Sequence, residues 1–377
     1  MQVVVVGGGY GGLRFIETLA PAKRHHITLV DKNPYHYLQT EAYEFLSGRK
    51  NICDITFSLQ SFCGYYDNVT FVQDEALGVE DGVLVCKKER IPFDVLVVAA
   101  GAKDFFPTEA IAKQSVRLKE LPGAFAFKQE FLKTLFEEVA YMRPARIVVG
   151  GGGLSGVELA ADFASVAKEC GAEVGQCSMV EVVLVEATDT LLPGSHPYLQ
   201  EQTLKRLQDL CVDVRFNAPI EDVDEAYIYL PQEKLRYDLF IFAGGIRASD
   251  FVQNLPFAKN RLGQLEVNEF LQVTPTIYAI GDAAAITNDR GELLPPTAQL
   301  AEQSAEYVAK RLLGSKKPFR GRIYGTFVAL GKDYAVGELF GKIHLKGKIA
   351  AWIKEAITRL YAFGIRIKVN SGYRKRL

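Results

Sequence analysis

The sequence predicts an α/β protein with two similar parallel-sheet domains and a smaller C-terminal region. Three observations support this prediction: a glycine-rich turn between a strand and a helix occurs twice, a second strand-and-turn unit is also repeated, and the pattern changes after Phe319. The length of 377 residues suits two or three domains, and 48% hydrophobic with 24% charged residues is normal for a globular protein.

The first glycine-rich turn follows a run of four valines, Val3–Val6. A β-branched run of this kind is typical of a buried parallel strand. The next residues fit the pattern G-x-G-x-x-G with Gly7, Gly9 and Gly12; a helical segment follows, and a second strand ends at Asp31. This order predicts a Rossmann-like dinucleotide site, because the glycines permit a tight turn and the close approach of a pyrophosphate, the helix N-terminus stabilises the phosphate charge, and the carboxylate accepts hydrogen bonds from a ribose.

The second turn follows the strand Arg146–Val149 and places Gly151, Gly153 and Gly156 in the same pattern. A helix and a further strand come next, and that strand ends at Glu186. Two such fingerprints are more specific than one, so we expect either two bound dinucleotides or one domain inserted in another. A carboxylate at this strand end would repel a ribose 2′-phosphate, which favours NAD over NADP; the alternative is that Glu186 is only a solvated strand end.

Two further segments repeat an aromatic-Asp pair, an apolar strand and a turn of small residues. The strands are Phe93–Ala99 and Tyr237–Ala243, and the turns follow at residues 100–102 and 244–245. Small residues let the chain cross close to a bound cofactor. This internal repeat supports two similar nucleotide-binding domains.

A later stretch combines a strand, an acidic turn and the start of a helix. The strand runs into Gly281-Asp282, and the helix begins near Thr297 after two prolines. Gln299 and Gln303 are four residues apart and so lie on one helix face, where both can reach one pocket. Spacing alone favours an exposed polar helix face for these glutamines, whereas their position after the acidic turn favours the pocket.

The charge distribution is uneven. Residues 342–377 hold ten Lys or Arg and one acidic residue, Glu355, for a formal charge of +9, whereas the preceding 341 residues carry −10. An acidic body with a basic end predicts an anionic partner for that end, either a membrane surface or a nucleic acid. No signal peptide is expected, and no run reaches the roughly 18 apolar residues of a spanning helix. The six cysteines lack a C-x-x-C spacing and the five histidines are scattered, so no metal site or redox dithiol is expected.

The C-terminal region predicts a hairpin and a helix. Thr326–Leu330 and Ala335–Phe340 flank a Gly-Lys-Asp turn, and a helix is expected from Lys348 to about Phe363. Its apolar residues recur at steps of three and four: Ile349, Trp352, Ile353, Ala356, Ile357, Leu360 and Phe363. One interpretation is a helix packed on the body of the protein. The other, favoured by Trp352 and the surrounding positive charge, is a helix at a membrane interface; the apolar stripe fits a nucleic acid less well.

Several of these segments together resemble the type II NADH dehydrogenases, flavoproteins that pass electrons from NADH to quinone without pumping protons. The most diagnostic is Ala298–Gln303, which fits A-Q-x-A-x-Q. Thr28–Gly48, Gly150–Glu158 and Tyr278–Asp282 are similar to the flavin and NADH segments of that family. The resemblance covers nearly the whole chain.

The resemblance implies a role for each matching residue. FAD is expected to contact Gly7, Gly9, Tyr10, Gly11, Gly12, Asp31, Lys32, Ala100, Gly101, Gly281, Asp282, Ala298 and Gln299. NADH is expected to contact Gly151, Gly153, Leu154, Ser155, Gly156, Glu186, Gly244 and Gly245. The expected catalytic residues, near the nicotinamide, the flavin or the quinone, are Glu158, Gln299, Gln303 and Lys354. For Glu158 two interpretations stay open: a carboxylate stabilised by the helix dipole, and a contact with the nicotinamide or a role in proton delivery.

The resemblance also implies a domain organisation and surroundings. Residues 1–112 and 241–317 would form a discontinuous FAD domain, 113–240 an inserted NADH domain, and 318–377 a membrane-associating region. The expected partners are menaquinone or ubiquinone, the membrane surface and a second copy of the chain, at the cytoplasmic face of the inner membrane. The chain departs from the family at Thr40-Glu41, where proline-leucine is usual, and at Ala100, where threonine is usual.

Three other functions share some of these sequence features. A sulfide:quinone oxidoreductase would share the fold but needs a redox cysteine late in the chain, whereas the last cysteine here is Cys211. A soluble NADH-dependent flavoprotein reductase would need neither A-Q-x-A-x-Q nor a basic amphipathic end. A flavin-binding redox sensor with a nucleic-acid-binding tail fits the apolar stripe poorly.

Overall fold

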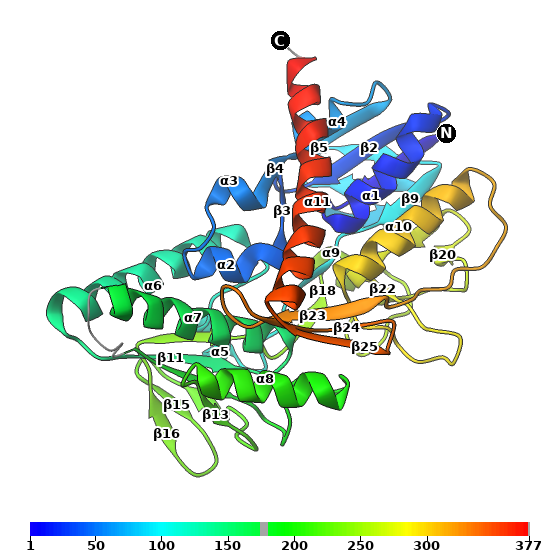
Figure 1. Ribbon diagram of the computed structural model, residues 1–377. Coiled ribbons are helices and arrows are strands. Elements are labelled where there is room, and N and C mark those ends of the chain that lie inside the picture. Colours follow the sequence, from blue (N-terminus) through cyan, green and yellow to red (C-terminus); the bar gives the residue numbers. More distant parts are fainter. Residues whose placement is uncertain (174–179, 376–377) are drawn as a thin grey trace.

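The structure is a computed structural model that describes residues 1–173 and 180–375 (Figure 1). Its first sheet has six strands in the order β20-β21-β9-β1-β2-β5, parallel except for β20. The four valines of β1 are buried, because a central strand in a sheet covered on both faces has no solvent side. The strands are β1 Gln2–Val6, β2 His26–Asp31, β5 Val69–Gln73, β9 Val95–Val98, β20 Gln272–Thr274 and β21 Ile277–Ala279.

The second sheet has four parallel strands in the order β13-β12-β11-β17. They are β11 Ala145–Gly150, β12 Val180–Val185, β13 Asp213–Arg215 and β17 Leu239–Phe242. Strand β17 lies across the expected domain boundary between residues 240 and 241. Because β17 pairs with β11 along its length, the second sheet continues to Phe242.

The repeat seen in the sequence is also a repeat of structure. The backbone N–H of Gln2 donates to Asp94 at 2.7 Å, and that of Arg146 donates to Asp238 at 2.8 Å, at equivalent places in the two sheets. In each domain a three-stranded antiparallel sheet comes before this aspartate. These strands are β6 Ala76–Glu80, β7 Val83–Cys86 and β8 Arg90–Pro92, and then β14 Asp222–Val223, β15 Tyr227–Tyr229 and β16 Lys234–Arg236.

The two domains are joined where their equivalent strands end. Strand β10, Ala102–Asp104, follows β9, and β18, Ile246–Ala248, follows β17. These two short strands pair with each other antiparallel. The chain therefore crosses between the domains twice at one place, beside the two small-residue turns.

Helices cover the sheets and begin at both glycine turns. Helix α1 starts at Tyr10 and α7 at Leu154, which are equivalent positions of the two fingerprints. The helices of the body are α1 Tyr10–Leu19, α2 Ala42–Leu46, α3 Ile52–Ile55, α4 Leu59–Cys63, α5 Glu109–Gln114, α6 Leu121–Tyr141, α7 Leu154–Glu173, α8 Pro197–Asp209, α9 Asp250–Asn254 and α10 Ala298–Leu312. Helices α1 and α10 pack together against the first sheet. Residues 174–179 before β12, which include Cys177, lie outside the described residues.

The C-terminal region differs from the prediction in two respects. A third strand, β25 Ile343–Gly347, joins the expected hairpin of β23 Gly325–Ala329 and β24 Ala335–Leu339. Helix α11 runs past Phe363 and spans Lys348–Arg374. Its second half packs against α4, and an ideal Cβ on Gly372 would lie 1.8 Å from the Ser61 carbonyl oxygen (Figure 1). The predicted end near Phe363 was based on the apolar stripe alone. The helix continues beyond it because its second half packs on the first domain.

Within the described residues, no helix combines the length and the apolar content needed to cross a bilayer.

Candidate functional site

The first glycine turn, between β1 and α1, has the shape that a pyrophosphate needs. Gly7 adopts a φ of +110°, and a Cβ there would lie 2.3 Å from the Ala99 carbonyl oxygen. A Cβ on Gly12 would lie 1.9 Å from the Gly7 oxygen, so α1 approaches the turn only with glycine at this position. The ideal Cβ position of Gly9 has open space within 4 Å. Packing therefore requires the first and third glycines, and the second leaves room for phosphate at the helix N-terminus.

The second turn, between β11 and α7, repeats this geometry. Gly151 has a φ of +106°, and a Cβ on Gly156 would lie 1.7 Å from the Gly151 oxygen. Gly153 faces open space, as Gly9 does. Gly244 packs against Gly151, so the small-residue turn crosses beside the glycine loop as expected.

The small-residue turns are also tied to the crossover between the domains. Ala100 packs beside the first glycine turn, where its Cα lies 3.0 Å from an ideal Cβ on Gly7. The carbonyl of Gly101 accepts a hydrogen bond from the backbone of residue 249 at 3.2 Å. The carbonyl of Gly245 accepts one from the backbone of residue 105 at 3.1 Å. Each turn is thus held by the chain that leads out of the other domain.

The acid at each strand end holds the turn of its own domain. Asp31 accepts from the Gly8 N–H at 2.6 Å, and Glu186 accepts from the Gly152 N–H at 2.6 Å. Burial raises the pKa of Asp31, and the hydrogen bonds from the backbone act against this shift. A carboxylate has about four lone-pair positions, so both acids keep acceptor capacity for ribose hydroxyls. The next residue, Lys32, is exposed.

The acidic turn after β21 is connected to α10 and to a lysine that the sequence analysis missed. Gly281 N–H donates to Ser304 of α10 at 3.0 Å. Lys119 Nζ lies 3.5 Å from Asp282 and donates to Gln39 Oε1 at 3.1 Å. No local pattern marks Lys119, because its partners come from distant parts of the chain. Its charge lies next to Asp282, which the sequence predicts as a contact of FAD.

Helix α10 begins at Ala298 with Thr297 as its N-cap. Gln299 and Gln303 lie on one face, as their spacing predicts, and there they bind the backbone of residues 322–324. Gln299 Oε1 accepts from the N–H of residue 324 at 2.7 Å, and the Gln303 amide makes two hydrogen bonds to the backbone of residue 322, at 2.7 and 3.0 Å. Within the described residues, the Nε2 group of Gln299 makes no hydrogen bond. The glutamines therefore hold the segment that enters β23, and one amide donor is left over.

Glu158 and Lys354 meet at the second domain. Glu158 is buried on α7, where it accepts from the Ala329 N–H at 2.7 Å and forms an ion pair with Lys354 of α11. Nearby, Tyr43 of α2 donates to Ser155 at 2.7 Å. The helix that starts at the second glycine turn is thus bound by the C-terminal region and by the first domain. The Glu158 carboxylate is paired, and the charge of the helix N-terminus is not its main partner.

Tyr10 and Leu154 occupy the same place in the two fingerprints but have different surroundings. Tyr10 packs against His36 and Tyr361 of α11, with ring centroids 5.1 and 5.0 Å away. His36 Nδ1 donates to the Gly8 carbonyl at 2.9 Å, and its Nε2 accepts from the Tyr361 hydroxyl at 3.1 Å. Burial lowers the pKa of His36 to about 4. Tyr361 of α11 thus packs on Tyr10 at the start of α1, whereas Leu154 at the start of α7 is 41% exposed.

Helix α11 has one packed face and one exposed face. On the packed face, Lys368 pairs with Glu17 at 2.8 Å and Lys375 with Asp67 at 3.2 Å, so part of the basic excess is balanced by the acidic body. The packed-helix interpretation is therefore correct for this face. The opposite face carries exposed apolar side chains, among which Trp352 is 73% exposed. We call this the C-terminal apolar surface: Phe340, Ile343, Ile349, Trp352, Ile357, Leu360, Phe363 and Ile367.

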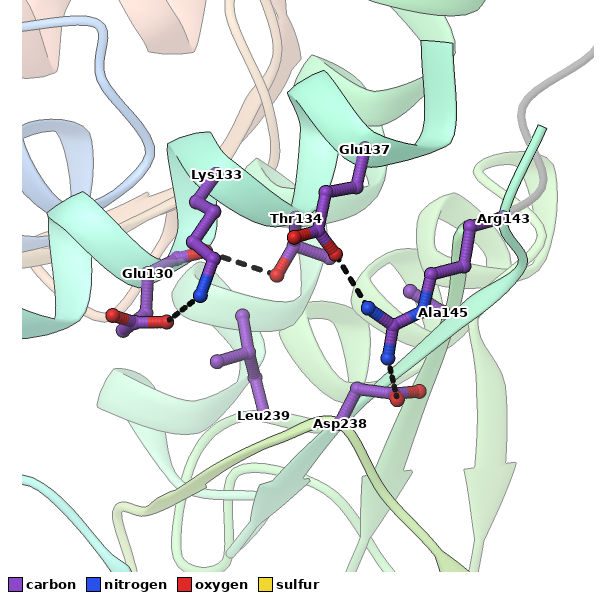
Figure 2. A pocket seen from close by; sticks show the side chains of 8 residues that line it. All are labelled: Glu130, Lys133, Thr134, Glu137, Arg143, Ala145, Asp238 and Leu239. Carbon is purple, nitrogen blue, oxygen red and sulfur yellow. Dashed lines mark hydrogen bonds and ion pairs between the residues drawn. The ribbon is translucent and has the colours of Figure 1, made fainter. Parts of the chain in front are cut away.

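A hollow lies on the second domain (Figure 2). Its charged lining residues pair with each other: Arg143 contacts Glu137 at 2.5 Å and Asp238 at 3.7 Å (Figure 2). Ala145 and Leu239 are the first residues of β11 and β17. The hollow therefore sits at the amino ends of the parallel strands, opposite the edge at which such sheets bind ligands, and we assign no cofactor to it.

Two of the histidines that are scattered in the sequence meet in space. The rings of His196 and His344 have centroids 4.3 Å apart, and with Glu338 their ligand atoms lie within 4.8 Å of one another. However, Nδ1 of His196 accepts the backbone N–H of Tyr198 at 3.1 Å, which places the ring proton on Nε2. A metal ligand needs an unprotonated nitrogen, so binding an ion here would break this helix cap. We assign no metal to this group.

The two loops, their strands and the acidic turn define a class of protein, the oxidoreductases that bind two dinucleotides on two related domains. Residues 1–305 match the family described as pyridine nucleotide-disulphide oxidoreductase, and the chain belongs to this family. The matched residues include both glycine loops and the Gly281-Asp282 turn.

Two relatives show which members of this class the chain is similar to. A type II NADH:quinone oxidoreductase of Haemophilus influenzae is 29% identical, with 98% of this chain and 95% of the relative covered. One of Staphylococcus aureus is also 29% identical, with 97% and 96% covered. Together with the family match, these relatives confirm the predicted resemblance, the enzyme class and the cofactors FAD and NADH.

Solved structures support the fold. An NDH2 of Plasmodium falciparum in complex with NADH superposes with a TM-score of 0.85 at 20% identity, covering 99% of this chain and 97% of that one. A sulfide:quinone oxidoreductase of Aquifex aeolicus superposes with a TM-score of 0.83 at 19% identity, covering 97% and 92%. At this identity the two superpositions show a shared fold alone.

Proposed function

We propose that the chain is an NADH:quinone oxidoreductase that takes a hydride from NADH and delivers two electrons to a membrane quinone without pumping protons. The observation that carries the proposal is the position of the start of α10. It lies between the Gly281-Asp282 turn and the segment that leads to the C-terminal apolar surface. FAD, held on the first glycine loop, would supply the ring that accepts the hydride and passes on the electrons.

The residues of this chain would bind the two cofactors, orient them and stabilise the negative charge that develops on reduction. The open space at Gly9 and Gly153 fits a pyrophosphate on each loop, and Asp282 with Lys119 supplies polar partners for a ribityl chain. The N-terminus of α10 provides a positive dipole where negative charge develops on reduction. The unused amide donor of Gln299 can meet a quinone carbonyl.

The Glu158–Lys354 pair supports a further part of the proposal. It lies at the start of α7, the helix that follows the second loop, and it joins that helix to the C-terminal region. We propose that the pair keeps the NADH loop in place beside the flavin. A direct contact of Glu158 with the nicotinamide is the alternative role.

Stopped-flow absorbance of the purified holoprotein tests the central proposal. NADH is expected to bleach the flavin, and a water-soluble quinone added afterwards is expected to restore its colour. Flavin that NADH leaves oxidised, or that quinone leaves reduced, would disprove the proposed reaction. Sulfide in place of NADH tests the alternative suggested by the shared fold, and we expect no bleaching because no cysteine follows Cys211.

We also propose that the C-terminal apolar surface places the protein at the surface of an anionic membrane. The exposed stripe and the adjacent Lys348 and Arg366 support this placement. Deleting α11 would expose the first glycine loop, so substitution is the better test. Leu360→Glu with Phe363→Glu is expected to abolish co-sedimentation with anionic liposomes. Phe136→Glu, on an exposed position of α6 in the second domain, is the matched control and should sediment like the wild type.

A further inference from the structure

Three ionisable side chains outside the glycine loops form a row that runs from the surface inward. Lys50 Nζ lies 2.8 Å from Glu44 and also forms an ion pair with Glu41. The exposed fraction of the side chain falls from 39% at Glu44 to 22% at Lys50 and 6% at Glu41. The lysine thus connects a carboxylate that meets solvent with one that does not.

The inner end of this row lies beside the proposed FAD site. Glu41 belongs to a single 3-10 turn with Gln39 and Thr40. Gln39 accepts a hydrogen bond from Lys119, which faces Asp282, and Thr40 shares a hydrogen bond of 2.8 Å with Tyr10 of the first fingerprint. Gln39 and Thr40 therefore connect Glu41 to two parts of the proposed FAD site, the Asp282 turn and the first fingerprint. Glu41 also stands where the family resemblance leads one to expect an apolar residue, so its burial needs a reason.

The surroundings of the row shift the pKa values of two of its groups toward neutral pH. Burial, and then repulsion by Asp162, raises the pKa of Glu44 to about 7. Burial lowers the pKa of Lys50. Groups with a pKa near the working pH are the most efficient proton carriers. The other charged groups that face the row are Glu158 on α7, Asp54 on α3, Lys354, Glu355 and Arg359 on α11, and Lys128 on α6, which donates to the Lys50 carbonyl.

We propose that Glu44, Lys50 and Glu41 carry a proton from solvent to the place where the quinone is reduced. The inference rests on the proposed function, because NADH + H⁺ + quinone gives NAD⁺ + quinol and takes one proton from the medium per turnover. The Glu41 carboxylate takes a proton from the Lys50 ammonium and passes it to the reduced quinone. Lys50 takes a proton from the Glu44 carboxyl, and solvent reprotonates Glu44. Every group ends in its starting state, and no other reactant is consumed.

The test separates the two half-reactions of the holoprotein in Glu44→Gln and Glu41→Gln. Bleaching by NADH is expected to proceed at the wild-type rate, because the hydride needs no proton from the medium. Reoxidation by a water-soluble quinone is expected to slow on the order of 10²-fold, the usual contribution of a positioned acid. In the wild type this rate should fall as pH rises through about 7, where Glu44 loses its proton, and that dependence should disappear in Glu44→Gln.

Two comparisons distinguish proton transfer from a structural role. Glu44→Asp keeps a carboxyl group and should retain the pH dependence, whereas Glu80→Gln removes an exposed carboxylate of β6 that does not face the row and should behave like the wild type. Infrared difference spectra of the oxidised holoprotein should show a carboxyl band that titrates near pH 7 and is missing in Glu44→Gln.

Reoxidation at the wild-type rate and with the wild-type pH dependence in both glutamine variants would overturn the proposal. Loss of bound FAD together with both half-reactions would overturn it as well, because that result assigns the row a structural role. If NADH fails to bleach the wild type, the proposed function is wrong. The infrared band decides separately whether Glu44 exchanges a proton.

Discussion

The first and second glycine loops share their turn and their terminal acid but differ in what covers them. In both, the acid accepts from a glycine N–H at 2.6 Å, and the third glycine admits no side chain. Beside the first loop, Tyr10 packs against His36 and Tyr361, so α11 covers this residue. Over the second, the equivalent Leu154 is 41% exposed. A covered loop suits a cofactor that stays bound, and an open loop suits a substrate that enters and leaves with each turnover.

One helix contacts both loops. Tyr361 of α11 reaches the first loop through His36, and Lys354, two turns earlier, pairs with Glu158 on the helix of the second. The exposed apolar stripe lies on the opposite face of the same helix. Attachment of that stripe to a membrane would thus act on an element that both cofactor loops share.

The largest expected effect comes from removing the third glycine of each loop. Gly12→Ala is expected to abolish FAD binding and to lower the free energy of unfolding by about 1–3 kcal/mol, because its Cβ would lie 1.9 Å from a carbonyl oxygen. Gly156→Ala makes the equivalent clash at 1.7 Å, yet it should leave FAD bound and abolish bleaching by NADH. Flavin absorbance per protein and stopped-flow bleaching measure the two outcomes.

A matched glycine controls for this pair. Gly364 of α11 has nothing within 4 Å of an ideal Cβ, so Gly364→Ala should leave both cofactors in place and stabilise the helix by about 0.5–1 kcal/mol. Loss of FAD from Gly156→Ala would show that the two loops are not independent and would break the comparison.

The second-largest expected effect is a loss of stability at acidic pH. The pKa of His36 is about 4 in the folded protein and about 6.5 when unfolded, so between these values the unfolded state binds the extra proton. The stabilisation from neutral His36 is complete above about pH 6.5 and is lost as pH falls toward 4, up to about 3 kcal/mol. We expect the free energy of unfolding measured in urea to fall over this pH window in the wild type and to fall less in His36→Gln.

FAD release followed by fluorescence should track the same window, because protonation of Nε2 breaks the bond from Tyr361. Unfolding curves of wild type and His36→Gln that shift in parallel with pH would show that this histidine does not control the packing of α11 beside the first loop.

The smallest effect concerns selectivity at the two acids. Glu186→Gln keeps an acceptor for Gly152 but removes the charge that repels a 2′-phosphate, so the ratio of kcat/KM for NADPH to that for NADH should rise about tenfold, or about 1.4 kcal/mol. Asp31→Asn should weaken FAD binding without changing this ratio. Steady-state kinetics with both nucleotides provide the measurement, and an unchanged ratio in Glu186→Gln would mean that the acid only holds its turn.

Much of the fold could be predicted because its signals are local. The valine run of β1, the spacing of the glycines and the aromatic-Asp repeat each lie within about ten residues, and the structure contains the corresponding elements at nearly the same bounds. The expected domain boundary at residue 240 falls inside β17, because the pairing of β17 with β11 is not visible in the chain itself. Strand β25 and the last turns of α11 were missed for the same reason.

The site shows the same division. The fingerprint glycines, Asp31 and Glu186 were predictable, since a dinucleotide loop requires these residue types at these distances. Lys119 beside Asp282, the backbone contacts of Gln299 and Gln303, and the Glu44–Lys50–Glu41 row were not, because their partners meet only after folding.

The sequence by itself determined that this chain builds two dinucleotide loops and ends in a basic amphipathic helix, because backbone sterics and side-chain periodicity are local properties. Only the tertiary structure decided that α11 covers Tyr10 beside the first loop and leaves the equivalent Leu154 beside the second loop exposed. Hydrogen bonds and ring contacts between α11 and the first domain make that choice, and they join His36 to Tyr361, which lie at opposite ends of the chain. The same docking leaves the apolar stripe of α11 exposed. Periodicity predicts that these side chains share one helix face, but it does not predict that this face is exposed.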